Sequence, residues 1–113
     1  IDNDTILGNY AWYGYHDVNF SPTGVTHEVG LKTANVLGLY DMCGNVSEWC
    51  FDEYGLITAQ TSDYVNLGAE TDCIIRGGSF MDDPYGCTVS YRELTWGKNS
   101  TSYSIGFRIA HTL

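Results

Sequence analysis

The chain has 113 residues, 43% hydrophobic and 17% charged, and its 14 acidic and 5 basic residues give a formal net charge of -9. This size suits one compact domain, residues 1–113, with no room for a second core. The acidic surface repels phosphates and anionic headgroups, which argues against nucleic-acid partners. No apolar run is long enough to enter a bilayer. The opening residues read like mid-sequence, so we expect a fragment or a processed form.

Turn-forming residues recur every several positions and leave little room for long helices. The short runs that read as strands are, in chain order, Tyr10–Tyr13, Val46–Phe51, Cys73–Phe80 and Ile105–Ile109. Thr88–Leu94 fits either a helical turn or a strand, and residues 56–68 and 97–104 read as long loops. The pattern predicts a loop-rich α+β domain that carries its function on the loops.

Four cysteines are spread along the chain without a C-x-x-C pair: Cys43, Cys50, Cys73 and Cys87. This spacing argues against a structural zinc site. Two alternatives stay open, namely one or two disulfides in an oxidising compartment, or small buried thiols.

The loop Gly44–Glu48 combines a turn-forming glycine with side-chain and backbone oxygens. Hard oxygen ligands that converge on one point suit calcium. The alternative is that Glu48 pairs with Arg76 or Arg108 while Asn45 caps the turn.

Residues Asn35–Trp49 read Asn, two residues, Gly-Leu-Tyr-Asp-Met, one residue, Gly-Asn-Val, one residue, Glu-Trp. This segment resembles the signature of the formylglycine-generating (sulfatase-modifying) enzyme family. Arg76–Phe80 and Ile105–Ala110 match later blocks in the family's order, and Tyr10–Tyr13 and Thr26–Gly30 are looser matches. The resemblance implies the C-terminal part of a C-type-lectin-like domain, with a small antiparallel sheet and little helix.

The family's calcium loop is similar to this one, which implicates Gly44, Val46 and Glu48 as ligands, with Asn45 or Cys43 adjacent. Its oxidase branch holds Cu(I) with two cysteines that follow the Gly-Gly-Ser-aromatic block. Those cysteines align with Asp82 and Cys87 here.

The substitution at position 82 argues against copper chemistry, because Cu(I) prefers soft thiolates to a hard carboxylate. Cys87 is thus a catalytic candidate only if the chain is an oxidase. Ser79 lacks the G-x-S-x-G context of a nucleophile. The three histidines, His16, His27 and His111, lack the spacing of an iron site. We therefore expect no catalytic residue, and the sequence argues against an enzyme.

Residues 81–104 are rich in Tyr, Ser, Thr, Asn and Asp, as are antibody paratopes. The arrangement also resembles the variable proteins of diversity-generating retroelements, which vary residues between the glycine strand and a final Ile-Gly-Phe-Arg. The exposed recognition positions that this implies are Asp82, Asp83, Tyr85, Glu93, Thr95, Trp96, Asn99, Ser102 and Tyr103. The alternative is an ordinary solvated loop anchored by Tyr91 and Trp96.

The sequence thus predicts a non-catalytic module that recognises a protein or glycan through residues 81–104. Display outside the cytoplasm goes with that function, while the compartment and the oligomeric state are not determined by the sequence. The alternative is a fragment or relative of the copper-dependent oxidase that converts a sulfatase cysteine to formylglycine. A third hypothesis is a structural domain stiffened by calcium.

Overall fold

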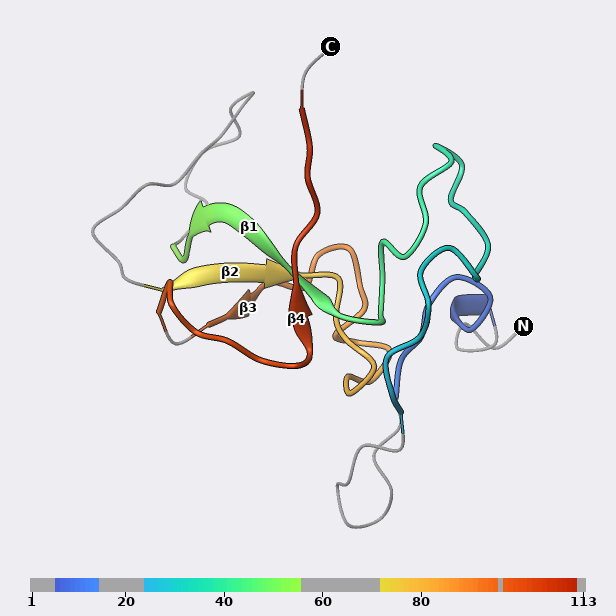
Figure 1. The fold of residues 1–113 in the computed structure, drawn as a ribbon, viewed down its shortest axis with the longest axis horizontal. Helices are drawn as coiled ribbons and strands as arrows, with labels where there is room; N and C mark the ends of the chain where they lie inside the picture. The colour runs from blue at the N-terminus through green and yellow to red at the C-terminus, as the bar shows by residue number, and fades with distance from the viewer. Residues whose placement is uncertain (1–5, 15–23, 56–71, 96, 112–113) are drawn as a thin grey trace.

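The computed structural model describes residues 6–14, 24–55, 72–95 and 97–111 (Figure 1). Its strands are β1 (Ser47–Glu53), β2 (Cys73–Arg76), β3 (Glu93–Leu94) and β4 (Ile105–Gly106). They form one sheet in the order β3-β2-β1-β4. Helix is confined, among the described residues, to the neighbourhood of Ile6 and Leu7. No helix in these ranges is long and apolar enough to cross a bilayer.

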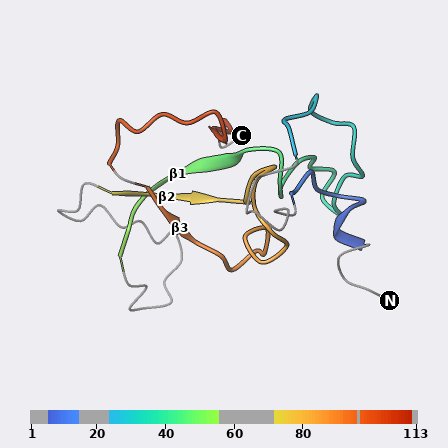
Figure 2. The ribbon, with the colours of Figure 1, turned by 90° about the horizontal axis from the view of Figure 1, so that it is seen from below.

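The sheet is mixed, which corrects the prediction of an antiparallel one. Strand β2 pairs antiparallel with both β1 and β3, but β4 lies parallel to β1. A parallel neighbour needs a crossover connection, and the chain between β3 and β4 supplies it. Figure 2 shows this connection arching along one side of the sheet.

Two predicted strands end earlier than expected, each for a local reason. The run from Cys73 stops at Arg76, because Gly77 and Gly78 adopt φ values of 92° and 70°, which a regular strand does not allow. The last run stops at Gly106, and the chain beyond it leaves the sheet (Figure 1). Phe107 and Ile109 are accordingly 76% and 83% exposed.

Of the other predicted elements, the structure confirms some and corrects others. Val46–Phe51 is confirmed as β1, shifted toward its C-terminal end. Tyr10–Tyr13 is not a strand, since only Trp12 forms an isolated bridge, with Gly44. Thr88–Leu94 resolves into turns followed by β3, and the loop predicted at 56–68 lies outside the described residues.

The apolar core is small and centres on β2. Ile74 and Ile75 are 2% and 4% exposed, and because successive strand residues face opposite sides, both faces of β2 are covered. Ala11, Phe80 and Cys87 complete the buried apolar set among the described residues. Aliphatic side chains on residues 25–39, such as Val29 and Leu37, are instead largely exposed.

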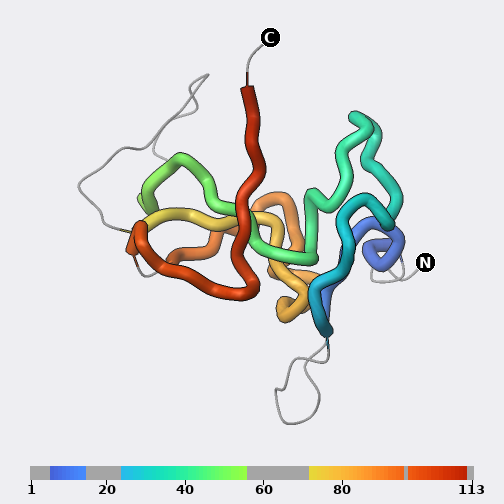
Figure 3. The backbone as a smooth tube through the Cα atoms, in the orientation of Figure 1, coloured from blue at the N-terminus to red at the C-terminus, as the bar shows by residue number. Residues whose placement is uncertain are grey.

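The loop that follows β2 connects the sheet to the N-terminal part of the chain. Figure 3 shows residues 77–90 between the sheet and the segments that contain residues 6–14 and 24–34. The amide of Gly14 donates to the carbonyl of Asp82 at 3.0 Å, and the amide of Gly44 donates to the carbonyl of Gly77 at 2.8 Å. These backbone bonds position the loop at one end of the sheet.

Gly44 should be among the positions least tolerant of a side chain. Its φ is 73°, and an added Cβ would lie 2.3 Å from the carbonyl oxygen of Trp12. Gly38 has a similar φ of 77° but open space around it. We expect Gly38→Ala to cost about 1 to 2 kcal/mol of unfolding free energy, and Gly44→Ala about 1 to 3 kcal/mol more. Urea denaturation measures both, and equal losses would contradict the tight packing at Gly44.

Candidate functional site

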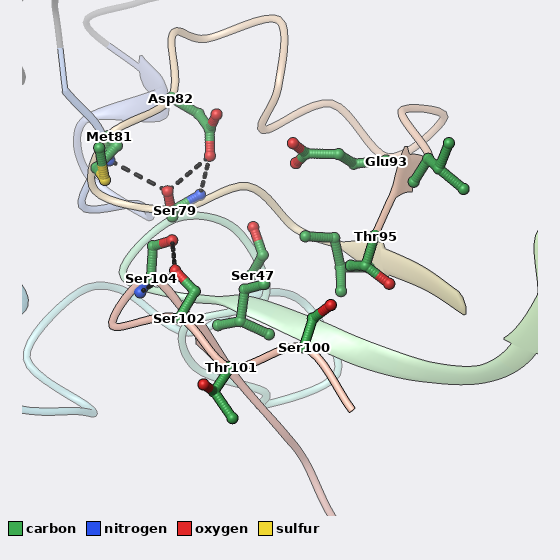
Figure 4. Close-up of a pocket in the computed structure, with 13 residues that line it drawn as sticks. Ser47, Ser79, Met81, Asp82, Glu93, Thr95, Ser100, Thr101, Ser102 and Ser104 are labelled. Atoms are coloured by element: carbon green, nitrogen blue, oxygen red, sulfur yellow. Dashed lines mark hydrogen bonds between the residues drawn. The ribbon is translucent and has the colours of Figure 1, made fainter. Parts of the chain in front are cut away.

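A polar groove of about 510 Å³ lies beside the sheet, between the loop after β2 and the connection that leads to β4 (Figure 4). The sheet contributes Ser47 from β1, Ile75 from β2 and Glu93 from β3. The remaining lining residues are Ser79, Met81, Asp82, Leu94, Thr95, Ser100, Thr101, Ser102, Ser104 and Ile105. Hydroxyl groups and two carboxylates thus dominate its polar surface.

Asp82 fixes the loop on one side of the groove. Its Oδ2 accepts hydrogen bonds from the amide and from the hydroxyl of Ser79, each at 2.7 Å. The amide of Asp82 donates back to the carbonyl of Ser79, and Met81 donates to the Ser79 hydroxyl. Position 82 therefore holds local backbone geometry, a role that the prediction of a recognition residue did not include.

Glu93 faces Asp82 across the groove (Figure 4). Burial raises the pKa of Glu93 above its ordinary value, and the negative charge of Asp82 adds to the rise. The two carboxylates therefore repel each other across the space between them.

Two further predicted recognition residues have structural roles. Thr95 was expected to be exposed, but it is 5% exposed, and its hydroxyl donates to the carbonyl of Cys73 at 3.1 Å. That prediction is wrong because Thr95 directly follows β3 and faces the edge of β2. The Asp83 carboxylate accepts from the amides of Tyr85 and Gly86 and so caps a turn.

The aromatic residues of the predicted surface lie in different places. Tyr103 is 74% exposed, with its ring 6.0 Å from that of Phe80, and its neighbours Ser102 and Ser104 line the groove. Tyr85 is 69% exposed and lines a separate apolar pocket. Its ring also meets the ring of Tyr91 edge-on. Asn99 is exposed, and Trp96 lies outside the described residues.

The groove thus brings together Asp82, Glu93, Thr95 and Ser102 of the predicted set. Sequence reasoning missed Ser47, which lies in β1, 34 residues before the predicted recognition segment begins at Met81. Its place within the signature segment Asn35–Trp49 was the available signal. The distance in sequence between β1 and the loops hid the contact.

The predicted calcium loop is engaged by protein groups. Both carboxylate oxygens of Glu48 accept from Arg108, at 2.8 to 3.1 Å, which is the ion pair that the sequence left as the alternative. Arg108 also donates to the carbonyls of Tyr40 and Asp41. The side chain of Asn45 exchanges two hydrogen bonds with the backbone of His27.

A carboxylate already held by a guanidinium does not favour a second cation, so the loop as folded does not fit calcium. One observation points the other way, since Oδ1 of Asp41 is buried without a hydrogen-bond partner in the same region. Calcium at Gly44, Asn45, Val46 and Glu48 therefore stays a prediction, with the condition that Arg108 moves away.

All four cysteines carry free thiols. Cys87 is 2% exposed, and burial raises its pKa to about 12, with further contributions from Cys43 and Asp82. The position where the oxidase branch has its first cysteine carries the loop-fixing carboxylate of Asp82. One buried thiol beside an engaged carboxylate does not supply the two soft ligands that the oxidase branch uses to hold Cu(I).

The histidines have unrelated surroundings. His27 stacks on Trp12 with ring centroids 3.7 Å apart, and His111 is exposed, while His16 lies outside the described residues. No group of three or more His, Cys, Asp or Glu side chains that could hold a metal ion occurs in the described part of the chain.

The sulfatase-modifying factor enzyme 1-like domain model matches residues 3–113. The chain belongs to this family. Among solved structures it is similar to the Treponema denticola variable protein 1, with 33% identity and a TM-score of 0.78 over 95% of this chain and 37% of that one. CarF is similar with 29% identity and a TM-score of 0.61, over 88% of this chain and 31% of that one. These neighbours confirm the loop-rich, C-type-lectin-like fold predicted from the sequence.

Two curated relatives are named serine/threonine-protein kinase pkn1. The protein from Chlamydia caviae is 40% identical over 84 residues, and that from Chlamydia pneumoniae is 37% identical over 86 residues. The matches cover 68% and 70% of this chain but only 13% of each relative. The family domain is therefore shared, while the activity named for those proteins is not carried over.

The burial of Cys87 predicts slow alkylation with a steep pH dependence. At pH 8 a thiol of pKa about 12 carries roughly a thousandfold less thiolate than one at the ordinary value. We expect iodoacetamide to label Cys87 at least about 100-fold more slowly in the folded than in the urea-unfolded protein, as followed by peptide mass spectrometry.

The same shift predicts how stability depends on pH. Because the raised pKa favours the protonated folded state, this contribution is fully present below the unfolded pKa and is lost as pH rises toward about 12. If iodoacetamide labels Cys87 as fast in the folded as in the unfolded protein at pH 8, the burial on which both expectations rest is contradicted.

Proposed function

We propose that this chain is a non-catalytic binding module that recognises a protein or glycan through the groove and the exposed residues of 81–104. The groove is the observation that carries the proposal. It is concave, polar and formed by loops that a sheet holds at both ends. Tyr103 adds exposed aromatic area beside it, and aromatic residues dominate the energetics of many interfaces.

Residues 81–104 include some that hold the backbone and others that are exposed, and this difference supports the proposal. Asp82, Asp83 and Thr95 hold backbone groups, so they maintain the loops whatever the ligand. Asn99 and Tyr103 are exposed, and their side chains do not hold backbone groups of the described residues in this way. In a surface that varies between relatives, the exposed positions would change and the residues that hold the backbone would stay the same. This expectation agrees with the similarity to a protein named a variable protein.

The first test compares two exposed aromatics on the full-length protein. Binders are selected from a random peptide-display library and from a glycan array. We expect Tyr103→Ala to weaken them about tenfold or more. Phe51, which is 80% exposed on β1 and does not line the groove, is the matched control. Phe51→Ala should leave affinity within about twofold. Equal effects of the two substitutions, or no binder at all, would overturn the proposal.

One observation favours the oxidase alternative. Cys43 and Cys87 line the same apolar pocket, so a second thiol lies near Cys87 although position 82 carries a carboxylate. If the chain is non-catalytic, titration with Cu(I) under anaerobic conditions should show no tight binding that depends on Cys87. Tight binding that is lost in both Cys87→Ser and Cys43→Ser would favour the oxidase instead.

A further inference from the structure

We propose that the groove accepts the ammonium or guanidinium group of a lysine or arginine side chain of a protein ligand, held between Asp82 and Glu93. This inference rests on the proposed function of the groove as the binding site. It adds the class of partner and the chemical group that the site recognises.

The groove has two carboxylates and no basic residue of its own. All five lysines and arginines of the chain are described, and none lines the groove. Each has a partner elsewhere: Lys32 with Gly8 and Trp12, Arg76 with Val89, Arg92 with Gly55, Lys98 with Glu53, and Arg108 with Glu48. The chain therefore supplies no lysine or arginine to neutralise Asp82 and Glu93.

Ser47 gives an independent indication of a ligand. The residue is 2% exposed, yet its hydroxyl makes no hydrogen bond with the described residues. Figure 4 shows this hydroxyl directed into the space that Asp82 and Glu93 face. This hydroxyl borders the groove, where an N–H donor of a bound cation would give it a hydrogen-bond partner.

The geometry favours an organic cation over a metal ion. The described residues hold no cluster of three or more acidic or other metal-ligating side chains, whereas a guanidinium or ammonium needs only two carboxylates and nearby hydroxyls. Ser102 and Ser104, whose hydroxyls lie 2.9 Å apart, supply polar surface on the opposite wall.

A protein ligand fits this charge better than a glycan does. Neutral sugar hydroxyls can donate hydrogen bonds to two facing carboxylates, but they leave the two negative charges unneutralised on removal from water, which is costly. Acidic sugars would be repelled by the same groups. Burial raises the pKa of Glu93, and the negative charge of Asp82 adds to the rise; a lysine or arginine side chain would offset that repulsion.

The experiment uses the full-length protein and a peptide selected on it from a random display library. We expect the selected peptides to be enriched in arginine or lysine. Replacing the key arginine by citrulline, which is neutral and nearly isosteric, should weaken binding about 10- to 100-fold. The Glu93→Gln variant should bind the arginine peptide and the citrulline peptide with affinities within about threefold of each other.

Two further variants separate the groove from general charge effects. Ser47→Ala should weaken the arginine peptide about 2- to 10-fold. Glu28→Gln removes the same charge at an exposed position outside the groove and should leave the preference for arginine unchanged.

The outcomes distinguish this inference from the proposed function. Binders that depend on Tyr103 but show no preference for arginine over citrulline would overturn the inference and leave the binding module standing. Binding of glycans alone would do the same. Failure of every binder to depend on Tyr103 would overturn both.

Discussion

Asn45 ties together four segments that are distant in sequence, and the site depends on this arrangement. Its amide donates to Trp12 at 2.6 Å, its carbonyl accepts from Phe80 at 2.9 Å, and its side chain bonds the backbone of His27 in both directions. It is 5% exposed and has a φ of 65°, a conformation that asparagine tolerates better than most residues. One buried residue thus links these segments through hydrogen bonds beside a small apolar core.

The groove follows from that constraint. Because Phe80 is fixed by Asn45, the neighbouring Ser79 is presented to the Asp82 carboxylate, which closes the loop on one side. On the other side, β4 lies parallel to β1 and brings the chain from Ser100 to Ser104 alongside Ser47. The sheet therefore sets the distance between two walls made largely of small polar side chains.

Position 82 has a structural role that depends on its carboxylate. A carboxylate there makes hydrogen bonds to the backbone and hydroxyl of Ser79, whereas a soft sulfur ligand would make them poorly. In this chain the residue stabilises a loop and places negative charge at the groove. Together with Glu93 it places two carboxylates at the groove of a chain whose net charge is already -9, and the proposal of a cationic partner rests on this arrangement.

The sequence by itself determined the family, the loop-rich fold and the cores of β1 and β2, because these depend on local motifs, turn residues and short apolar runs. It also indicated Asp82 and Glu93, which both line the groove. Only the tertiary structure decided that β4 is parallel to β1, that Thr95 is buried and that Ser47 lines the groove. Glu48 shows why: of its two possible arginine partners, Arg108 binds it from 60 positions along the chain. The choice between such partners depends on how the segments pack in space, which no local pattern of residues encodes.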